Sequence, residues 1–278
     1  MIKNIILCAD DYAQNPAISQ GIINLIAENR LSAISCLVNS PYWLEHANWL
    51  KPFIGQIDIG LHFNLTLGSP LGNMPQLASA GSFPALLQIL IRSYLFKIRE
   101  NEVYAELNRQ INQFEKALGK PPDFIDGHQH IQCLPIIRRA ILTCYDKRLK
   151  TNSVWIRNIR VQNIQQLLSN PAAIKKSILY LLGGNIFKKL LTKAHIPHNS
   201  TFSGIYNFKT IIPYSELFPQ FLREIDNQGV IMCHPGLVNN DKNDPILNTR
   251  IAEYNYFMSD SFLKECQQQY VKLSRFYL

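Results

Sequence analysis

The sequence contains few charged residues and no long uninterrupted apolar segment. Charged residues make up 17% of its 278 residues and hydrophobic residues 47%, a balance that disordered chains do not show. No segment reaches the roughly eighteen consecutive apolar residues that a membrane-spanning helix requires, because the nearest, 177–191, is interrupted by Gly183, Gly184 and lysines. The apolar run before Asp10 is also too short for a signal peptide. We therefore expect a folded cytoplasmic protein without a transmembrane segment.

The sequence also lacks the short motifs of several common enzyme classes. It contains no GxSxG, HExxH, Walker or GxGxxG motif. Its six cysteines stand singly, without a CxxC pair, and this spacing predicts reduced thiols. A cysteine nucleophile at Cys133 or Cys233 is a minor alternative, because both adjoin apolar strand residues and nothing nearby indicates an activated thiolate.

The formal net charge of +8 raises the question of an anionic partner. Lys and Arg are scattered in no more than short doublets and form no recognisable nucleic-acid motif, so we expect no nucleic-acid partner. The segment 164–195 is apolar with interspersed lysines. It predicts a pair of helices that covers a sheet, with contact to a membrane surface or a lipid-linked sugar as the alternative.

The N-terminal part of the chain has the pattern of a parallel α/β sheet. Residues 5–9 form a continuous apolar run, typical of a strand buried on both faces. Asn15 and Pro16 predict the start of a helix after it, and 33–39 predicts the next strand. This strand, helix, strand order is the unit from which parallel sheets are built.

Alternation within later strands predicts which polar side chains share a face. In the expected strand 58–65, His62 lies opposite a row of apolar side chains. In the expected strand 123–130, the same alternation puts three polar side chains on one face, namely Asp126, His128 and His130. The segment 68–84 predicts a long loop, followed by helices at 86–98 and 103–118 and a strand at 153–159.

Polar side chains stand at the ends of four separate expected strands. They are Asp10 and Asp11, His62, His128 with His130, and His234 after the apolar run 229–233. The carboxyl ends of parallel strands meet at one face of a (β/α) barrel, so we expect these residues to converge. Each one alone has an ordinary structural explanation, but burying all of them without a ligand would repeatedly cost desolvation energy. A metal site removes that cost.

The residue types also indicate the chemistry of such a site. Two imidazoles and one carboxylate form a three-ligand set that leaves positions open for water and substrate. One of the adjacent residues Asp10 and Asp11 can bind the ion while the other accepts a proton, because neighbours in extended backbone point in different directions. A metal ion polarises a carbonyl and lowers the pKa of water, as hydrolysis of an amide requires. The residues therefore predict a metal-dependent hydrolase.

Four sequence blocks contain these polar residues. They are Ala9-Asp10-Asp11-Tyr12, Gly60-Leu61-His62-Phe63-Asn64-Leu65-Thr66, Asp126-Gly127-His128-Gln129-His130 and Cys233-His234-Pro235-Gly236. In sequence, order and spacing they resemble the signature blocks of the YdjC-like carbohydrate deacetylase family, which includes chitooligosaccharide deacetylases and hopanoid-associated deacetylases. The resemblance spans about residues 3–265, nearly the whole chain.

The resemblance implies a TIM-barrel-like α/β barrel, distorted or incomplete, that removes N-acetyl groups from an amino sugar or oligosaccharide. The ligands that it implies for one divalent ion are Asp11, His62 and His128. We expect this ion to be Mg²⁺ or Zn²⁺, and two imidazoles with one carboxylate favour Zn²⁺ chemically. It implies Asp10 as the general base and His234 as the group that protonates the leaving amine or holds the oxyanion. His130 and Arg157 become substrate-binding residues, and a homodimer is a further expectation.

The chain departs from the family pattern in three places. Gly127 stands where serine is more common, and Tyr12-Ala13 stands where phenylalanine and glycine are usual, so the local backbone can differ. The segment 164–208 looks divergent and leaves open which sugar is used. We expect a single domain, 1–278, with a helical insertion around 164–208.

Two alternatives to sugar deacetylation stay open. The same site could hydrolyse another amide or a phosphoester, because metal-activated water is not selective by itself. A protein of another class would be a catalytically silent barrel that binds a glycan or a lipid-linked sugar. The retention of Asp10 beside all three implied ligands argues against that reading.

Overall fold

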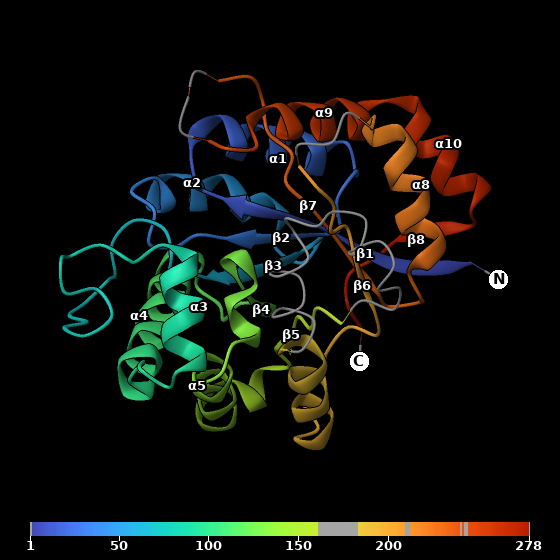
Figure 1. The fold of residues 1–278 in the computed structure, drawn as a ribbon. Helices are drawn as coiled ribbons and strands as arrows, with labels where there is room; N and C mark the ends of the chain where they lie inside the picture. Colours follow the sequence, from blue (N-terminus) through green and yellow to red (C-terminus); the bar gives the residue numbers. More distant parts are fainter. Residues whose placement is uncertain (1, 161–182, 209–211, 240, 242–243, 278) are drawn as a thin grey trace.

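The computed structural model describes residues 2–160, 183–208, 212–239, 241 and 244–277 (Figure 1). Strands and helices alternate through most of the chain. In order they are β1 (Lys3–Tyr12), α1 (Pro16–Ala27), β2 (Ala33–Cys36), α2 (Trp43–Leu50), η1 (Lys51–Phe53), β3 (Asp58–Phe63), α3 (Leu86–Tyr94), α4 (Glu100–Leu118), β4 (Phe124–Gly127), η2 (His128–Cys133), α5 (Ile137–Cys144), η3 (Tyr145–Leu149), η4 (Lys150–Asn152), β5 (Trp155–Ile156), β6 (Phe202–Ser203), α8 (Tyr214–Glu224), β7 (Val230–Cys233), α9 (Leu247–Met258), α10 (Asp260–Gln268) and β8 (Val271–Leu273). Residues 183–193 are also helical.

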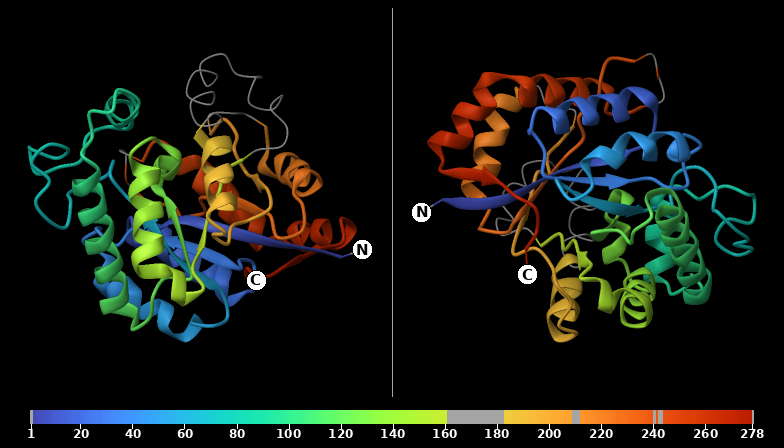
Figure 2. Two further views of the ribbon diagram at one scale, coloured as in Figure 1. Left: turned by 90° about the horizontal axis from the view of Figure 1, so that it is seen from below. Right: turned by 180° about the vertical axis from the view of Figure 1, so that it is seen from behind.

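The strands form one curled parallel sheet with helices around it (Figures 1 and 2). The strand order is β5-β4-β3-β2-β1-β7-β6, and β8 pairs with the first residues of β1. Near the edges, Ile156 of β5 forms one isolated parallel bridge with His198, which precedes β6. The prediction of an α/β fold is therefore confirmed, and the curled parallel sheet is consistent with a distorted (β/α) barrel. The described strands approach closure at this bridge but do not form a regular eight-stranded TIM barrel.

The first strand and helix form for the reasons that the sequence indicates. The side chains from Ile5 to Tyr12 are buried on both faces, as expected for a central strand of a parallel sheet. Asn15 Oδ1 accepts a hydrogen bond of 2.9 Å from the Ile18 amide and thereby caps α1, and Pro16 occupies its first turn. The long helix α4 ends at Gly119, whose φ of 70° is the left-handed conformation that glycine adopts readily.

Two predicted strands are much shorter in the structure. β4 ends at Gly127, because the next residues turn into η2 and both Gln129 (φ 53°) and His130 (φ 60°) are left-handed. The prediction that one strand covers 123–130 is therefore wrong, and His128 and His130 do not alternate along a strand with Asp126. The predicted strand 153–159 is reduced to β5, so Arg157 follows its end. Similarly, β2 ends at Cys36 and α3 ends at Tyr94.

Much of the predicted helical insertion at 164–208 lies outside the described residues. The part that is described contains the helix 183–193 and strand β6. Within the described ranges, no helix combines the length and apolar character needed to cross a membrane.

Candidate metal centre

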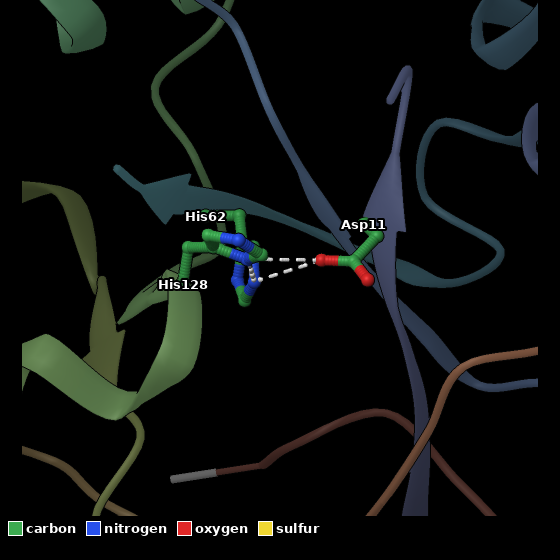
Figure 3. Close-up of side chains that lie close together, drawn as sticks. All are labelled: Asp11, His62 and His128. Carbon is green, nitrogen blue, oxygen red and sulfur yellow. Dashed lines mark hydrogen bonds and ion pairs between the residues drawn. The ribbon is translucent and has the colours of Figure 1, made fainter. Parts of the chain in front are cut away.

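Three side chains from distant parts of the chain converge at the carboxyl end of the sheet (Figure 3). They are Asp11 from β1, His62 from β3 and His128 directly after β4. Asp11 Oδ1 lies 3.1 Å from His128 Nδ1 and 3.5 Å from His62 Nε2, and these two nitrogens are 3.3 Å apart. Asp11 and His62 are buried, and the His128 side chain is 12% exposed. The structure thus brings the three predicted ligands together.

The three atoms have the spacing and chemistry of a metal-binding set. Bonds of about 2.0–2.2 Å at tetrahedral angles separate ligand atoms by about 3.3 Å, which matches these distances. Among the described residues, no hydrogen-bond donor of good geometry reaches Asp11 Oδ1, although the atom is buried. A buried carboxylate oxygen facing two imidazole nitrogens needs a cation or a proton between them. The residues therefore fit a divalent ion.

The backbone of β1 turns Asp11 toward this centre. Asp11 has a φ of 67°, at an irregularity where the pairing register between β1 and β2 shifts. A non-glycine residue in this region carries strain, which concentrates at functional sites. Arg250 donates from its guanidinium to Asp11 Oδ2 at 2.8 Å, so Oδ1 alone faces the imidazoles. Burial tends to raise the Asp11 pKa, but Arg250, His128 and His62 hold it well below its usual range.

His62 is oriented by a carboxylate behind it. Its Nδ1 lies 2.7 Å from Asp126 Oδ1 and 3.0 Å from the Ser35 hydroxyl, which leaves Nε2 directed at Asp11. This carboxylate, histidine, metal arrangement is common in metalloenzymes and fixes the ring and its tautomer. Burial alone lowers the His62 pKa, but Asp126 and the contact with Asp11 raise it to about 10. The carboxylates around this ring therefore favour a positive charge on it, which a proton or a metal ion can supply.

Asp10, His62 and Asp126 form a second group of potential ligands. Arg157 balances the negative charge of its two carboxylates. Arg157 is completely buried and contacts both Asp10 oxygens at 2.7 Å. It also lies 2.8 Å from Asp126 Oδ2. Burial tends to lower the Arg157 pKa, but the two carboxylates raise it well above the ordinary value. Because an arginine already occupies the space between these carboxylates, the Asp11 group is the better cation site.

His234 directly follows β7, which pairs with β1 on the side away from β2 and β3. Burial lowers the His234 pKa, and Asp11 and Asp10 oppose that shift. Its ring meets Phe208 edge to face, with the centroids 5.2 Å apart. Its backbone amide donates to Glu253, a completely buried carboxylate that also accepts 2.6 Å from the Tyr206 hydroxyl. Burial raises the Glu253 pKa to about 7, although both of these hydrogen bonds oppose the shift.

The other two predicted substrate-binding residues are placed differently. His130 packs edge to face against Phe202 at 5.5 Å, and burial lowers its pKa to about 3. Arg157 faces Asp10 and Asp126, and its side chain has no exposed surface. Its contact with substrate stays a prediction, and its observed partners indicate that it positions Asp10.

Sequence reasoning did not assign four residues that support the centre, namely Ser35, Asp126, Arg250 and Glu253. Asp126 stands in the same dense polar block as His128, so a signal was present. Arg250 and Glu253 lie on α9, outside any recognisable motif, and Arg250 is far along the chain from Asp11. Only the fold shows that they reach the site.

Comparison with known proteins places these residues in a family context. The model of a family described as YdjC-like protein matches residues 4–268. A chitooligosaccharide deacetylase of Yersinia pestis bv. Antiqua (strain Angola) is 28% identical over 244 residues, which cover 86% of this chain and 84% of the relative. A chitooligosaccharide deacetylase of Yersinia pseudotuberculosis (strain YPIII) gives the same identity and coverage.

A solved structure supports the same fold. A protein of Enterococcus faecalis V583 that is named for cellobiose-phosphate cleavage superposes with a TM-score of 0.75. The alignment covers 99% of this chain and 98% of that one, at 21% identity. The curled parallel sheet is thus shared over the full length of both chains.

Proposed function

The chain belongs to the YdjC-like protein family, and on that premise we propose that it is a carbohydrate deacetylase that hydrolyses the N-acetyl group of an amino sugar. The observation that supports this most directly is the convergence of Asp11, His62 and His128 next to Asp10, which Arg157 holds through both oxygens. Amide hydrolysis is accelerated by a Lewis acid that polarises the carbonyl, by a general base and by a proton donor. In this proposal the site supplies a residue or a residue set for each of these roles.

We propose that Asp11, His62 and His128 hold one divalent ion, with zinc favoured over magnesium. Octahedral Mg²⁺ at about 2.0–2.1 Å would separate neighbouring ligands by about 2.9 Å and prefers oxygen donors. The separations of 3.1–3.5 Å and the two imidazoles are closer to a tetrahedral zinc set. When bound, the ion would polarise the acetamide carbonyl and lower the pKa of the attacking water.

In this proposal Asp10 accepts the proton of the attacking water. It adjoins the metal ligand Asp11 in the chain, and Arg157 fixes its orientation through contacts to both oxygens. His234 then donates a proton to the leaving amine. Because burial lowers its pKa, its protonated form is a stronger acid than an exposed imidazolium.

The test is acetate release by zinc-loaded protein from a panel of N-acetylated monosaccharides, oligosaccharides and lipid-linked saccharides. Asp10→Asn should lower kcat by about 10²–10⁴-fold, the usual contribution of a general base, while the bound zinc is unchanged. Asp146→Asn is the matched control, because that carboxylate is 78% exposed and its one ion pair among the described residues is with the exposed Lys150 at 3.8 Å. Full activity of Asp10→Asn would refute its role as base.

The same assay separates the remaining alternatives. Phosphate release from model esters without acetate release would indicate a phosphoesterase, and saccharide binding without turnover would indicate a silent glycan-binding protein. The cytoplasmic location, the homodimer and the absence of a nucleic-acid partner stay predictions.

A further inference from the structure

Helix α3 exposes an apolar stripe to solvent. Its inner face is buried through Ile89 and Leu90, as expected for a helix packed on the domain. Its outer face carries Leu87, Ile91 and Leu95, spaced four residues apart and each more than half exposed. Phe96 extends this stripe at the end of the helix and is 66% exposed. The described part of the chain leaves these four residues, here called the α3 stripe, mostly uncovered.

The charges around the α3 stripe have one sign. Between Asp58 and Glu100 the sequence contains no acidic residue, but it contains Arg92, Lys97 and Arg99. Lys97 and Arg99 are exposed. Glu100 itself is engaged by the Arg139 guanidinium. Among the residues that the structure describes, neither Lys97 nor Arg99 forms an ion pair with a carboxylate, so the apolar stripe is bordered by unpaired cations.

The two other carboxylates near this region are turned inward. Glu102 accepts hydrogen bonds from the amides of Gln76 and Leu77, and Glu106 accepts one from Leu71. These contacts fix the loop 68–84 against α4. The carboxylates thus hold the loop in place and contribute little negative charge to the outer surface.

The position of the stripe relates it to the candidate metal centre. Loop 68–84 and α3 follow the carboxyl end of β3, the strand that carries His62. They lie at the outer edge of the molecule, and α10 lies at the opposite side (Figures 1 and 2). A membrane or partner bound at α3 would therefore contact the segment that follows the carboxyl end of β3, the strand end at which His62 lies.

We propose that the α3 stripe and its bordering cations bind the surface of an anionic lipid membrane. An apolar helix face bordered by Lys and Arg is the usual form of a peripheral membrane contact. A second copy of the chain is the less favourable occupant, because a symmetric contact would bring the same cations of both copies together. The inference does not rest on the proposed function, since membrane binding needs no turnover.

The experiment is cosedimentation of the full zinc-loaded chain with vesicles. Binding should be strong on vesicles that mix phosphatidylcholine with phosphatidylglycerol and weak on phosphatidylcholine alone. It should fall between about 0.1 M and 1 M salt, because the Debye length shrinks from about 10 Å to about 3 Å. Equal binding to both vesicle types, or none to either, would overturn the proposal.

Matched variants locate the contact. Lys97→Gln and Arg99→Gln should each weaken binding about fivefold, the effect of one cation near an anionic surface. Ile91→Gln/Leu95→Gln should weaken it at least as much. The controls, Lys264→Gln/Lys272→Gln and Leu263→Gln/Tyr270→Gln, change exposed residues at the other side of the molecule and should leave binding intact.

Three readouts keep the outcome decisive. All the altered side chains are exposed, so thermal unfolding and acetate release should match the parent protein. If the control variants lose binding equally, the net charge of +8 rather than the α3 stripe is responsible. If sedimentation shows a dimer that Ile91→Gln/Leu95→Gln dissociates, a second copy covers the stripe and the proposal fails.

Discussion

Acidic residues at the two ends of the sheet have different kinds of partner. At the amino end, Asp58 Oδ2 accepts 2.7 Å from the Phe276 amide, and its Oδ1 lies 2.8 Å from Arg275 Nε. Asp123 next to it accepts 2.8 Å from the Ile59 amide and pairs with Lys120 at 2.6 Å. Backbone amides thus supply one partner to each carboxylate at this end.

At the carboxyl end the carboxylates Asp10, Asp11 and Asp126 face side chains instead. Their partners are two arginines, Arg157 and Arg250, and the imidazoles of the metal centre. The backbone there includes the left-handed residue Asp11, and one of its oxygens lacks a hydrogen bond among the described residues. The comparison indicates that acids bonded to backbone amides hold the fold, and that acids facing arginines and imidazoles, among them the strained Asp11, mark the functional end.

The largest expected effect tests this division directly. Asp11→Asn should abolish stoichiometric zinc binding and acetate release, because a neutral amide oxygen is a much weaker ligand than a carboxylate. Asp58→Asn should keep the zinc and lose about 1–3 kcal/mol of stability, because a buried hydrogen-bonded oxygen is replaced. Elemental analysis and chemical unfolding measure the two quantities. Equal zinc loss in both variants would remove the distinction between the ends.

An intermediate effect is expected for the carboxylate that orients His62. Asp126→Asn should weaken zinc affinity about 10–100-fold, because the His62 ring loses its charged partner while the three ligands remain. Competition with a chelator of known affinity measures this change. Asp123→Asn is the matched control at the other end and should leave zinc affinity unchanged. An unaltered affinity in Asp126→Asn would show that packing alone orients the ring.

The last prediction concerns pH and Glu253. Its pKa is raised from 4.5 to about 7 in the folded protein, so the folded state binds the proton more tightly than the unfolded state. Its contribution to stability is therefore fully present below about pH 4.5 and is lost as the pH rises through 7. Glu253→Gln lacks this titration. Between those limits the parent should lose up to about 3 kcal/mol relative to the variant in denaturant unfolding.

The control for this prediction is the difference in unfolding free energy between the parent protein and the Glu253→Gln variant at each pH. Both carry the same metal ligands, so other titrations cancel in the difference between parent and variant. Parallel stability curves from pH 4.5 to 8 would contradict a raised pKa at Glu253.

Much of the fold and of the ligand set was visible in the sequence. The apolar runs and the Asn15 cap predict β1, α1 and their order correctly, because these elements form from local pattern. The ends of β4 and β5 were not predictable in this way. Gln129 and His130 adopt left-handed backbone without a glycine to signal it.

The environment of the centre was less visible than its ligands. Arg250 reaches Asp11 only because α9 packs beside α1, a contact between the two ends of the chain. The sequence indicates that Arg157 belongs to the site, and the structure adds its two carboxylate partners, Asp10 and Asp126. Sequence patterns report residue types at strand ends, and tertiary packing decides which of them face one another.

The pairing of β8 with β1 has a consequence for how the site is assembled. Lys3–Ile5 bond to Val271–Leu273, whereas the later part of the same strand carries Asp10 and Asp11. The strand that bears both acids is therefore completed by a segment near the other end of the chain. Pairings between residues so far apart in sequence form slowly. During synthesis the first residues of β1 lack this partner until Val271–Leu273 is made. A fragment that ends before Val271 would keep that strand edge unpaired, and such an edge favours aggregation.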